Sequence, residues 1–189
     1  MMKVMVFLFC YTETMKLFFI YGPPASGKLT IAEKLSEHTA IPLFHNHLSR
    51  DLVKDIYKDK LRDNYELVDR IRFDVLDYCS KNNTDLIFTY VYEGSDDDEN
   101  VRQFIGTIEN NKGEVIFIEL SANQNDLIDR VNNESRKRYK KLTDPKIMKD
   151  ITQDMSIYSI PFVEALRIDT SVLSPDDSVT LISQTFQLN

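Results

Sequence analysis

The chain has 189 residues, of which 42% are hydrophobic and 28% are charged. That length fits one ordinary domain with a substantial core, and the composition excludes wholesale disorder and fibrous repeats. The formal charge of -7, from 23 basic and 30 acidic residues, argues against binding to nucleic acid or to an anionic membrane. Only two cysteines occur, Cys10 and Cys79. They are far apart, which excludes a disulfide framework and a cysteine zinc site and points to the cytoplasm.

The first residues contain an apolar run from Val4 to Tyr11. This run lacks a small-residue cleavage site and is too short to span a bilayer. We therefore expect residues 1–14 to be an optional extension and residues 15–189 to form a single domain, with an additional edge strand as the alternative for the extension.

Strand-like and helix-like stretches alternate along the rest of the chain, and this alternation predicts an α/β fold with a parallel sheet covered by helices on both faces. The expected strands are Leu17–Tyr21, Pro42–Phe44, Asp85–Tyr92, Val115–Leu120 and Leu166–Asp169. The expected helices are Lys28–His38, Leu48–Tyr57, Asn64–Lys81, Glu99–Asn111, Gln124–Asn133, Pro145–Tyr158 and Pro175–Phe186.

Local patterns add detail to this outline. In the third helix an apolar stripe at helical spacing is predicted to face the core, and its members are Leu67, Ile71, Val75 and Leu76. Asn111-Lys112-Gly113 is expected to form a turn, and Ser174-Pro175 is expected to begin the last helix as its cap and first-turn pair.

The strongest motif follows the first expected strand, where the sequence reads Gly22-Pro23-Pro24-Ala25-Ser26-Gly27-Lys28-Leu29-Thr30. It fits the pattern G-x-x-x-x-G-K, with the hydroxyl residue one place later than usual. Glycines allow backbone N–H groups to curl around an anion, and a helix that starts near Lys28 directs its positive end at the phosphates. We expect this whole segment to bind ATP, with Lys28 reaching the β- and γ-phosphates and Thr30 binding Mg²⁺. The alternative is a strand–turn–helix connection that contains glycines for other reasons.

The segment from Gly22 to Thr30, with one residue between lysine and threonine, resembles the phosphate-binding loop of adenylate kinase and other nucleoside monophosphate kinases. The wider order of elements is similar to the shikimate kinase and chloramphenicol phosphotransferase group of small-molecule kinases. This resemblance implies a three-layer P-loop NTPase fold with a five-stranded parallel sheet, an acceptor site after the second strand and a mobile lid late in the chain.

Polar residues follow the second expected strand, where the carboxyl end of a parallel strand is a usual place for ligands. We expect His45, Asn46, His47 and Arg50 to bind the substrate, with Arg50 clamping an anionic group. In the resembling shikimate and gluconate kinases an Asp-x-Asp pair stands at this place, whereas here His45 and His47 occupy it. Our hypothesis is that His47 contacts the acceptor hydroxyl and that Asp51, one helical turn further, orients it or is the base. Alternatively, the two histidines cap the following helix or form a structural pair.

An aspartate at the end of the third strand, which would hold the metal's outer shell, is absent, and Glu93 is the candidate to replace it. The acidic run Asp96–Glu99 is interpreted as the negatively charged first turn of a helix.

Basic residues gather late in the chain. The resemblance implies an arginine-bearing lid over ATP, for which we expect residues 134–144, with Arg136 and Arg138 as catalytic cations and Arg130 as an ATP-binding residue. A solvated charged helix face is the alternative.

The sequence thus predicts an enzyme that uses ATP and Mg²⁺ to phosphorylate a hydroxyl of a small molecule. The alternatives are a nucleotide-binding regulatory or interaction module without turnover, and a nucleoside monophosphate kinase. Expected partners are a nucleotide and a small-molecule acceptor, without nucleic acid or membrane, in a monomer or homodimer.

Overall fold

A computed structural model describes residues 14–131 and 144–188 of the chain. A five-stranded sheet forms its centre, all strands run parallel, and their order is β2-β3-β1-β4-β5. The strands are β1 (Lys16–Tyr21), β2 (Leu43–His45), β3 (Leu86–Tyr90), β4 (Glu114–Ser121) and β5 (Ala165–Asp169).

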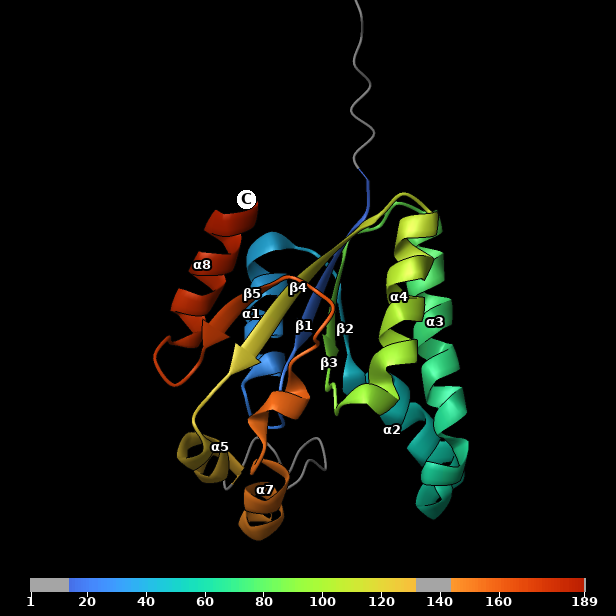
Figure 1. The fold of residues 1–189 in the computed structure, drawn as a ribbon. Coiled ribbons are helices and arrows are strands. Elements are labelled where there is room, and N and C mark those ends of the chain that lie inside the picture. The colour runs from blue at the N-terminus through green and yellow to red at the C-terminus, as the bar shows by residue number, and fades with distance from the viewer. Residues whose placement is uncertain (1–13, 132–143, 189) are drawn as a thin grey trace, which may run out of the picture.

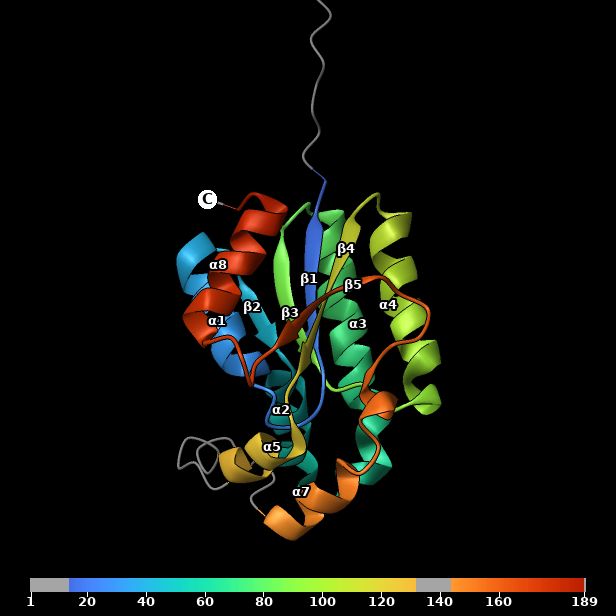
Figure 2. The same cartoon turned by 60° about the vertical axis from the view of Figure 1, so that its left-hand side comes forward.

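Helices cover both faces of this sheet, which gives three layers (Figure 1). They are α1 (Lys28–Thr39), α2 (Asn46–Tyr57), α3 (Tyr65–Lys81), α4 (Asp98–Asn110), α5 (Gln124–Val131), α7 (Pro145–Ile151) and α8 (Pro175–Phe186). Short 3-10 turns occupy Lys58–Lys60, Arg62–Asn64, Ser95–Asp97 and Met155–Tyr158. Helices α1 and α8 lie on one face and α3 and α4 on the other, as Figure 2 also shows from the side.

The position of β1 at the centre of the sheet, covered by helices on both faces, explains why its sequence is apolar without alternation. Leu17, Phe19 and Tyr21 pack into the core under α3 and α4, whereas Phe18 and Ile20 pack into the core under α1 and α8. Successive side chains of a strand point to opposite faces, so a strand covered on both sides must be apolar at every position. The alternation of elements therefore correctly predicts the α/β architecture.

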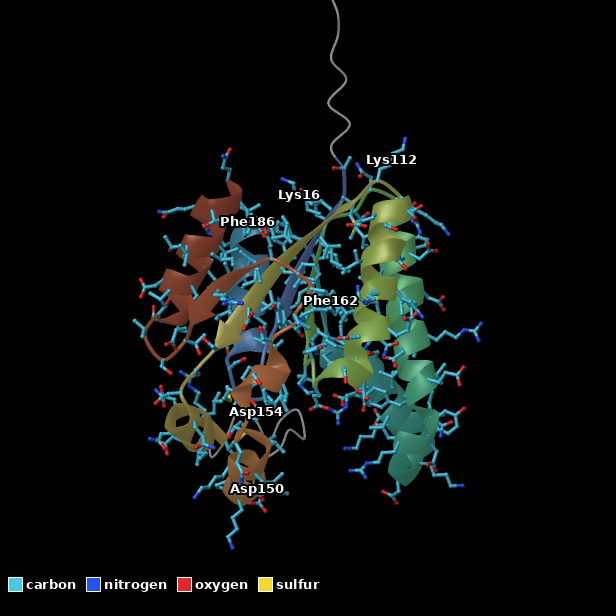
Figure 3. All side chains as sticks on the ribbon, viewed as in Figure 1. Lys16, Lys112, Asp150, Asp154, Phe162 and Phe186 are labelled. Carbon is cyan, nitrogen blue, oxygen red and sulfur yellow. The ribbon has the colours of Figure 1, made fainter. Side chains whose placement is uncertain are left out.

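All five strands end on the same side of the molecule. Lys16 and Lys112 lie at the opposite end from Asp150 and Asp154 (Figure 3), and α2, α5 and α7 lie beyond the carboxyl ends of the strands (Figure 1). Among the described residues, no helix has the length and apolarity needed to cross a membrane.

Several local predictions are confirmed. Ser174 is the cap of α8, its hydroxyl accepts a hydrogen bond from the Asp177 N–H, and Pro175 occupies the first turn. The turn at Asn111–Gly113 separates α4 from β4. Asp98 and Glu99 lie in the first turn of α4, as expected for the acidic run.

One helix prediction is wrong and another is confirmed only in part. The helix expected over Pro145–Tyr158 ends at Ile151, because the Asp154 carboxylate accepts the Ser156 N–H and begins a separate short turn. In α3 the most buried line runs through Val68, Arg72 and Leu76. Of the predicted stripe, Leu76 is fully buried and Ile71 and Val75 pack half-buried against the same core, while Leu67 is half-buried. The stripe therefore does face the core, but the prediction missed Arg72 on the same face.

Candidate functional site

The loop between β1 and α1 has the backbone shape that the glycine spacing predicts. Gly22 has a φ of 141°, and a Cβ atom placed on it would lie 2.1 Å from the Leu120 carbonyl oxygen. Gly27 has a φ of 90° and immediately precedes the first turn of α1. Ala25 is also left-handed, with a φ of 67°. Three residues of this short segment thus hold conformations that L side chains rarely adopt, so the loop is strongly curled.

Lys28 folds back over this loop. Its Nζ donates to the carbonyl oxygens of Gly22 at 2.8 Å and Pro23 at 2.7 Å, and it lies 3.5 Å from the hydroxyl oxygen of buried Ser26. The positive charge is therefore held directly over the curled backbone at the amino end of α1. A helix N-terminus with an adjacent ammonium group is a favourable place for an anion.

A cavity of about 600 Å³ opens beside the loop. The residues of this loop and of the first turn of α1 that line it are Pro24, Ala25, Gly27, Lys28, Leu29 and Thr30. Of the residues expected to bind substrate, Asn46, His47 and Arg50 line the same cavity. Gly22, Pro23, Ser26, His45 and Asp51 are not among its lining residues. Arg136 and Arg138, with nearly all of the expected lid at 134–144, lie outside the described residues.

The junction between β2 and α2 positions the residues that were expected to bind the substrate. His45 is the last residue of β2 and pairs with Thr89 in β3, and the Asn46 N–H donates to the Thr89 hydroxyl at 3.0 Å. Helix α2 begins at Asn46, two residues earlier than expected. His45 occupies the cap position, but its side chain makes no capping hydrogen bond. Because α2 begins at the cavity and leads away from it, His47 and Arg50 reach the cavity.

Arg72 of α3 is a site residue that sequence analysis missed. Its side chain is only 1% exposed, yet it lines the cavity. The guanidinium donates to Asp69 at 2.6 Å, to the Ser49 hydroxyl at 3.3 Å and to the Asn46 side-chain oxygen. These bonds use three of the five guanidinium N–H groups. The buried Arg72 therefore links α3 to the first turn of α2.

Two tyrosines flank this guanidinium. The carbon atom Cζ of Arg72 lies 5.6 Å from the ring centre of Tyr65 and 5.4 Å from that of Tyr90, and both rings line the cavity. These distances fit cation–π contacts, which help to stabilise a charge removed from water. The sequence carried one signal for this arrangement, since Arg72 is four residues from both Val68 and Leu76 and therefore shares their buried face.

Carboxylates also form part of the cavity wall. Asp97 lines the cavity and accepts hydrogen bonds from the Tyr90 hydroxyl at 2.8 Å and the Glu93 N–H at 2.7 Å. Desolvation at the cavity wall, followed by the negative charge of Asp97, raises the pKa of Glu93, while the charges of Arg50 and Lys28 act in the opposite direction. Glu93 thus lies within electrostatic reach of both Lys28 and Arg50.

Arg130 of α5 connects the phosphate loop to the segment after β5. Its guanidinium donates hydrogen bonds to the Thr170 hydroxyl at 2.9 Å and to the Thr170 carbonyl oxygen at 2.7 Å. It also donates a longer bond, of 3.4 Å, to the Ala25 carbonyl oxygen. Thr170 in turn bonds to the Ser121 carbonyl oxygen at the end of β4. Arg130 therefore fixes one end of the cavity, where it is also a lining residue.

Several solved structures have the same architecture as this chain. A candidate kinase from Chloroflexus aurantiacus superposes with a TM-score of 0.73 at 18% identity, over 93% of this chain and 98% of that one. The chain has the fold of the P-loop kinases. A tunicamycin resistance protein from Deinococcus radiodurans has a TM-score of 0.63 at 16% identity, over 93% and 97% of the two chains. A sugar kinase from Janibacter sp. has a TM-score of 0.59 at 13% identity, over 93% of this chain and 95% of that one.

These identities show a shared fold and nothing finer. No protein-family model matches the sequence, and no curated protein matches it. Because one fold can host many reactions, the reaction has to be inferred from the side chains that line the cavity.

Proposed function

We propose that this protein is an enzyme that transfers the γ-phosphoryl group of ATP to a hydroxyl group of a small, anionic acceptor. One observation carries the proposal: Lys28 and Thr30 of the phosphate loop line the same cavity as His47, Arg50 and Glu93. A donor phosphate and an acceptor could therefore meet in one space, which is the main requirement of phosphoryl transfer.

The nucleotide would occupy the end of the cavity formed by the phosphate loop. Backbone N–H groups of the loop and Lys28 would bind its β- and γ-phosphates, and the segment at Thr170, held by Arg130, would border the base. The Thr30 hydroxyl also lines this end of the cavity, and it offers a hard oxygen atom of the kind that Mg²⁺ prefers. Bound Mg²⁺ would neutralise charge that develops on the phosphate oxygens.

The acceptor would occupy the other end, beside α2 and α3. Arg50 and Arg72 supply positive charge there, with the Arg72 guanidinium retaining two N–H groups beyond its described bonds. His47 would contact the reacting hydroxyl. In the transfer, the hydroxyl oxygen bonds to the γ-phosphorus, the bond from that phosphorus to the bridging oxygen breaks, and ADP leaves.

We assign the hydroxyl proton to Glu93 rather than to Asp51. Glu93 lines the cavity, and its raised pKa brings its basicity closer to that of a useful general base. Asp51 is not among the lining residues, so its position gives no support to a direct role.

The test is acceptor-dependent transfer of radiolabelled γ-phosphate from Mg·ATP. A panel of sugar acids, phosphorylated sugars, nucleoside monophosphates and hydroxylated antibiotics is screened first by thermal shift, and the hits are assayed for product. We expect one anionic class to yield product, and Lys28→Ala to lower the rate by at least about 100-fold. Nucleotide binding without product from any acceptor would favour a regulatory module, and absence of nucleotide binding would refute the whole proposal.

A further inference from the structure

Arg62 is a further cation that lines the cavity. It lies in the 3-10 turn Arg62–Asn64, within the connection between α2 and α3. The Asn64 N–H donates to the Leu61 carbonyl oxygen at 3.1 Å, which closes this turn. Leu61 and Tyr65, on either side of the turn, line the cavity as well. The connection therefore presents several side chains to the cavity, and Arg62 is the charged one among them.

The charged residues that line the cavity are mostly cations, although the whole chain carries a formal charge of -7. The cations are Lys28, Arg50, Arg62, Arg72 and Arg130, and the carboxylates are Glu93 and Asp97. Lys28 and Arg130 contact the backbone of the phosphate loop. The other three cations come from α2, from α3 and from the connection between these helices. Such an excess of positive charge in a cavity of an acidic protein attracts anions.

The three arginines away from the phosphate loop differ in their partners. Arg72 forms an ion pair with Asp69 at 2.6 Å. For Arg50 and Arg62, by contrast, residues 14–131 and 144–188 provide no hydrogen bond and no ion pair. Glu93 interacts with Arg50 only electrostatically. Two guanidinium groups at the cavity are thus available to an anion.

A phosphate monoester suits this set of arginines better than a carboxylate does. Near neutral pH it carries a charge of about −1.5 to −2 and offers three strong acceptor oxygens. A carboxylate has one charge and two oxygens, and a single guanidinium fork can bind both of them. Arg72 also retains two N–H groups beyond its described bonds. Guanidinium groups from three segments therefore match the charge and the oxygens of one phosphate group.

We infer that the acceptor is a small molecule that already carries a phosphate monoester, and that Arg62 binds this phosphate together with Arg50 and Arg72. The inference rests on the proposed function and names the class of its acceptor. Arg62 is then a specificity-determining residue, since it selects a dianionic acceptor over a neutral or singly charged one. The product carries phosphate at two positions.

The inference is tested by isothermal titration of the whole protein after its phosphate loop has been filled with Mg·AMP-PNP, an ATP analogue that is not hydrolysed. Ribose, ribonate and ribose 5-phosphate form one series of probes, and glycerol, glycerate and glycerol 3-phosphate form another. Inorganic phosphate is the probe without a carbon skeleton. We expect each phosphate ester to bind at least about ten times more tightly than the carboxylate of its series.

Variants of Arg62 should change this preference and leave nucleotide binding intact. Arg62→Gln should weaken the binding of phosphate esters and of inorganic phosphate about ten-fold, with an unchanged affinity for Mg·AMP-PNP. Arg62→Lys keeps the charge without the planar fork, so its loss should be smaller. Arg70→Gln is the matched control, because Arg70 is an exposed arginine of α3 that does not line the cavity, and it should bind every probe like the wild type.

The inference fails if carboxylates bind as tightly as phosphate esters, if no phosphate probe binds, or if Arg62→Gln and Arg70→Gln behave alike. Each of these results leaves the proposed function standing, because that proposal is tested by transfer from ATP to any acceptor. Absence of Mg·AMP-PNP binding would instead refute the proposed function and this inference together.

Discussion

The guanidinium of Arg72 donates a hydrogen bond to the side-chain oxygen of Asn46, 26 residues earlier in the chain. Asn46 begins α2 and directly precedes His47, while Arg72 is held in α3 by Asp69. This contact therefore fixes the position of the helix turn that carries His47 relative to the wall of the cavity.

Replacement of Arg72 should destabilise the protein. Arg72→Leu leaves Asp69, Asn46 and Ser49 without their charged donor in a buried place, and we expect a loss of about 2–4 kcal/mol in the free energy of unfolding. Arg72→Lys keeps the charge but not the planar fork, so its loss should be smaller. Urea denaturation measures both values. The control is Arg70→Leu, at an exposed position of the same helix, and an equal loss in this variant would contradict the assignment.

Gly22→Ala should abolish nucleotide binding. Its methyl group would meet the Leu120 carbonyl oxygen at 2.1 Å, and its φ of 141° is unfavourable for alanine. Isothermal titration with Mg·ATP and thermal unfolding report the two effects. Gly106→Ala is the matched control, since a Cβ there has open space inside α4, and helix propensity predicts a gain of up to about 1 kcal/mol. Unchanged affinity in Gly22→Ala would mean that the loop does not bind the phosphates.

Glu93 should set the acid limb of the pH–rate profile for transfer to an identified acceptor. A base must be deprotonated, so the rate should fall as the pH falls through the pKa of Glu93, which desolvation at the cavity wall and the charge of Asp97 raise above the ordinary 4.5. Asp97→Asn removes a neighbouring negative charge and should move the limb to lower pH. Glu93→Gln should lower the rate by about 100-fold or more and remove the limb while ATP binding persists.

Asp96→Asn serves as the control for these variants, because Asp96 is exposed and is not a lining residue of the cavity. If Glu93→Gln transfers phosphate at the wild-type rate, another group accepts the proton.

Arg130→Ala should weaken ATP binding about ten-fold. The change removes the bonds to Thr170 and the contact with the Ala25 carbonyl oxygen, which leaves both the phosphate loop and the segment after β5 less well held. Titration with Mg·ATP measures the affinity. Lys149→Ala on nearby α7 removes an exposed charge and should leave the affinity for Mg·ATP unchanged. A similar loss of affinity in both variants would indicate a general charge effect.

Much of the site was predictable where its residues are contiguous in the chain. The phosphate loop is one uninterrupted segment, and its glycines and lysine are sufficient to predict both its curled backbone and the helix that follows. The predicted strands could be located because strands covered on both faces are apolar at every position. Arg136 and Arg138 stay predictions, since they lie outside the described residues.

The acceptor side was predictable only in part. His47, Asn46 and Arg50 follow a strand directly and do line the cavity. Helical spacing also suggested Asp51, but successive residues of a helix point in different directions, and Arg50 lines the cavity whereas Asp51 does not. Tyr65 and Tyr90 were not predicted, because an aromatic residue in a helix or strand usually belongs to the core.

By itself the sequence determined the curled loop at Gly22–Gly27 and the α/β layers, because both follow from local spacing and from apolar runs along the chain. Only the tertiary structure decided that Arg72 is buried beside Asn46 and faces the cavity, and that Tyr90 and Asp97 meet at the cavity wall. The reason is physical: a charge can be buried only where partners from several elements converge on it, and that convergence is a property of the packed chain rather than of any one segment.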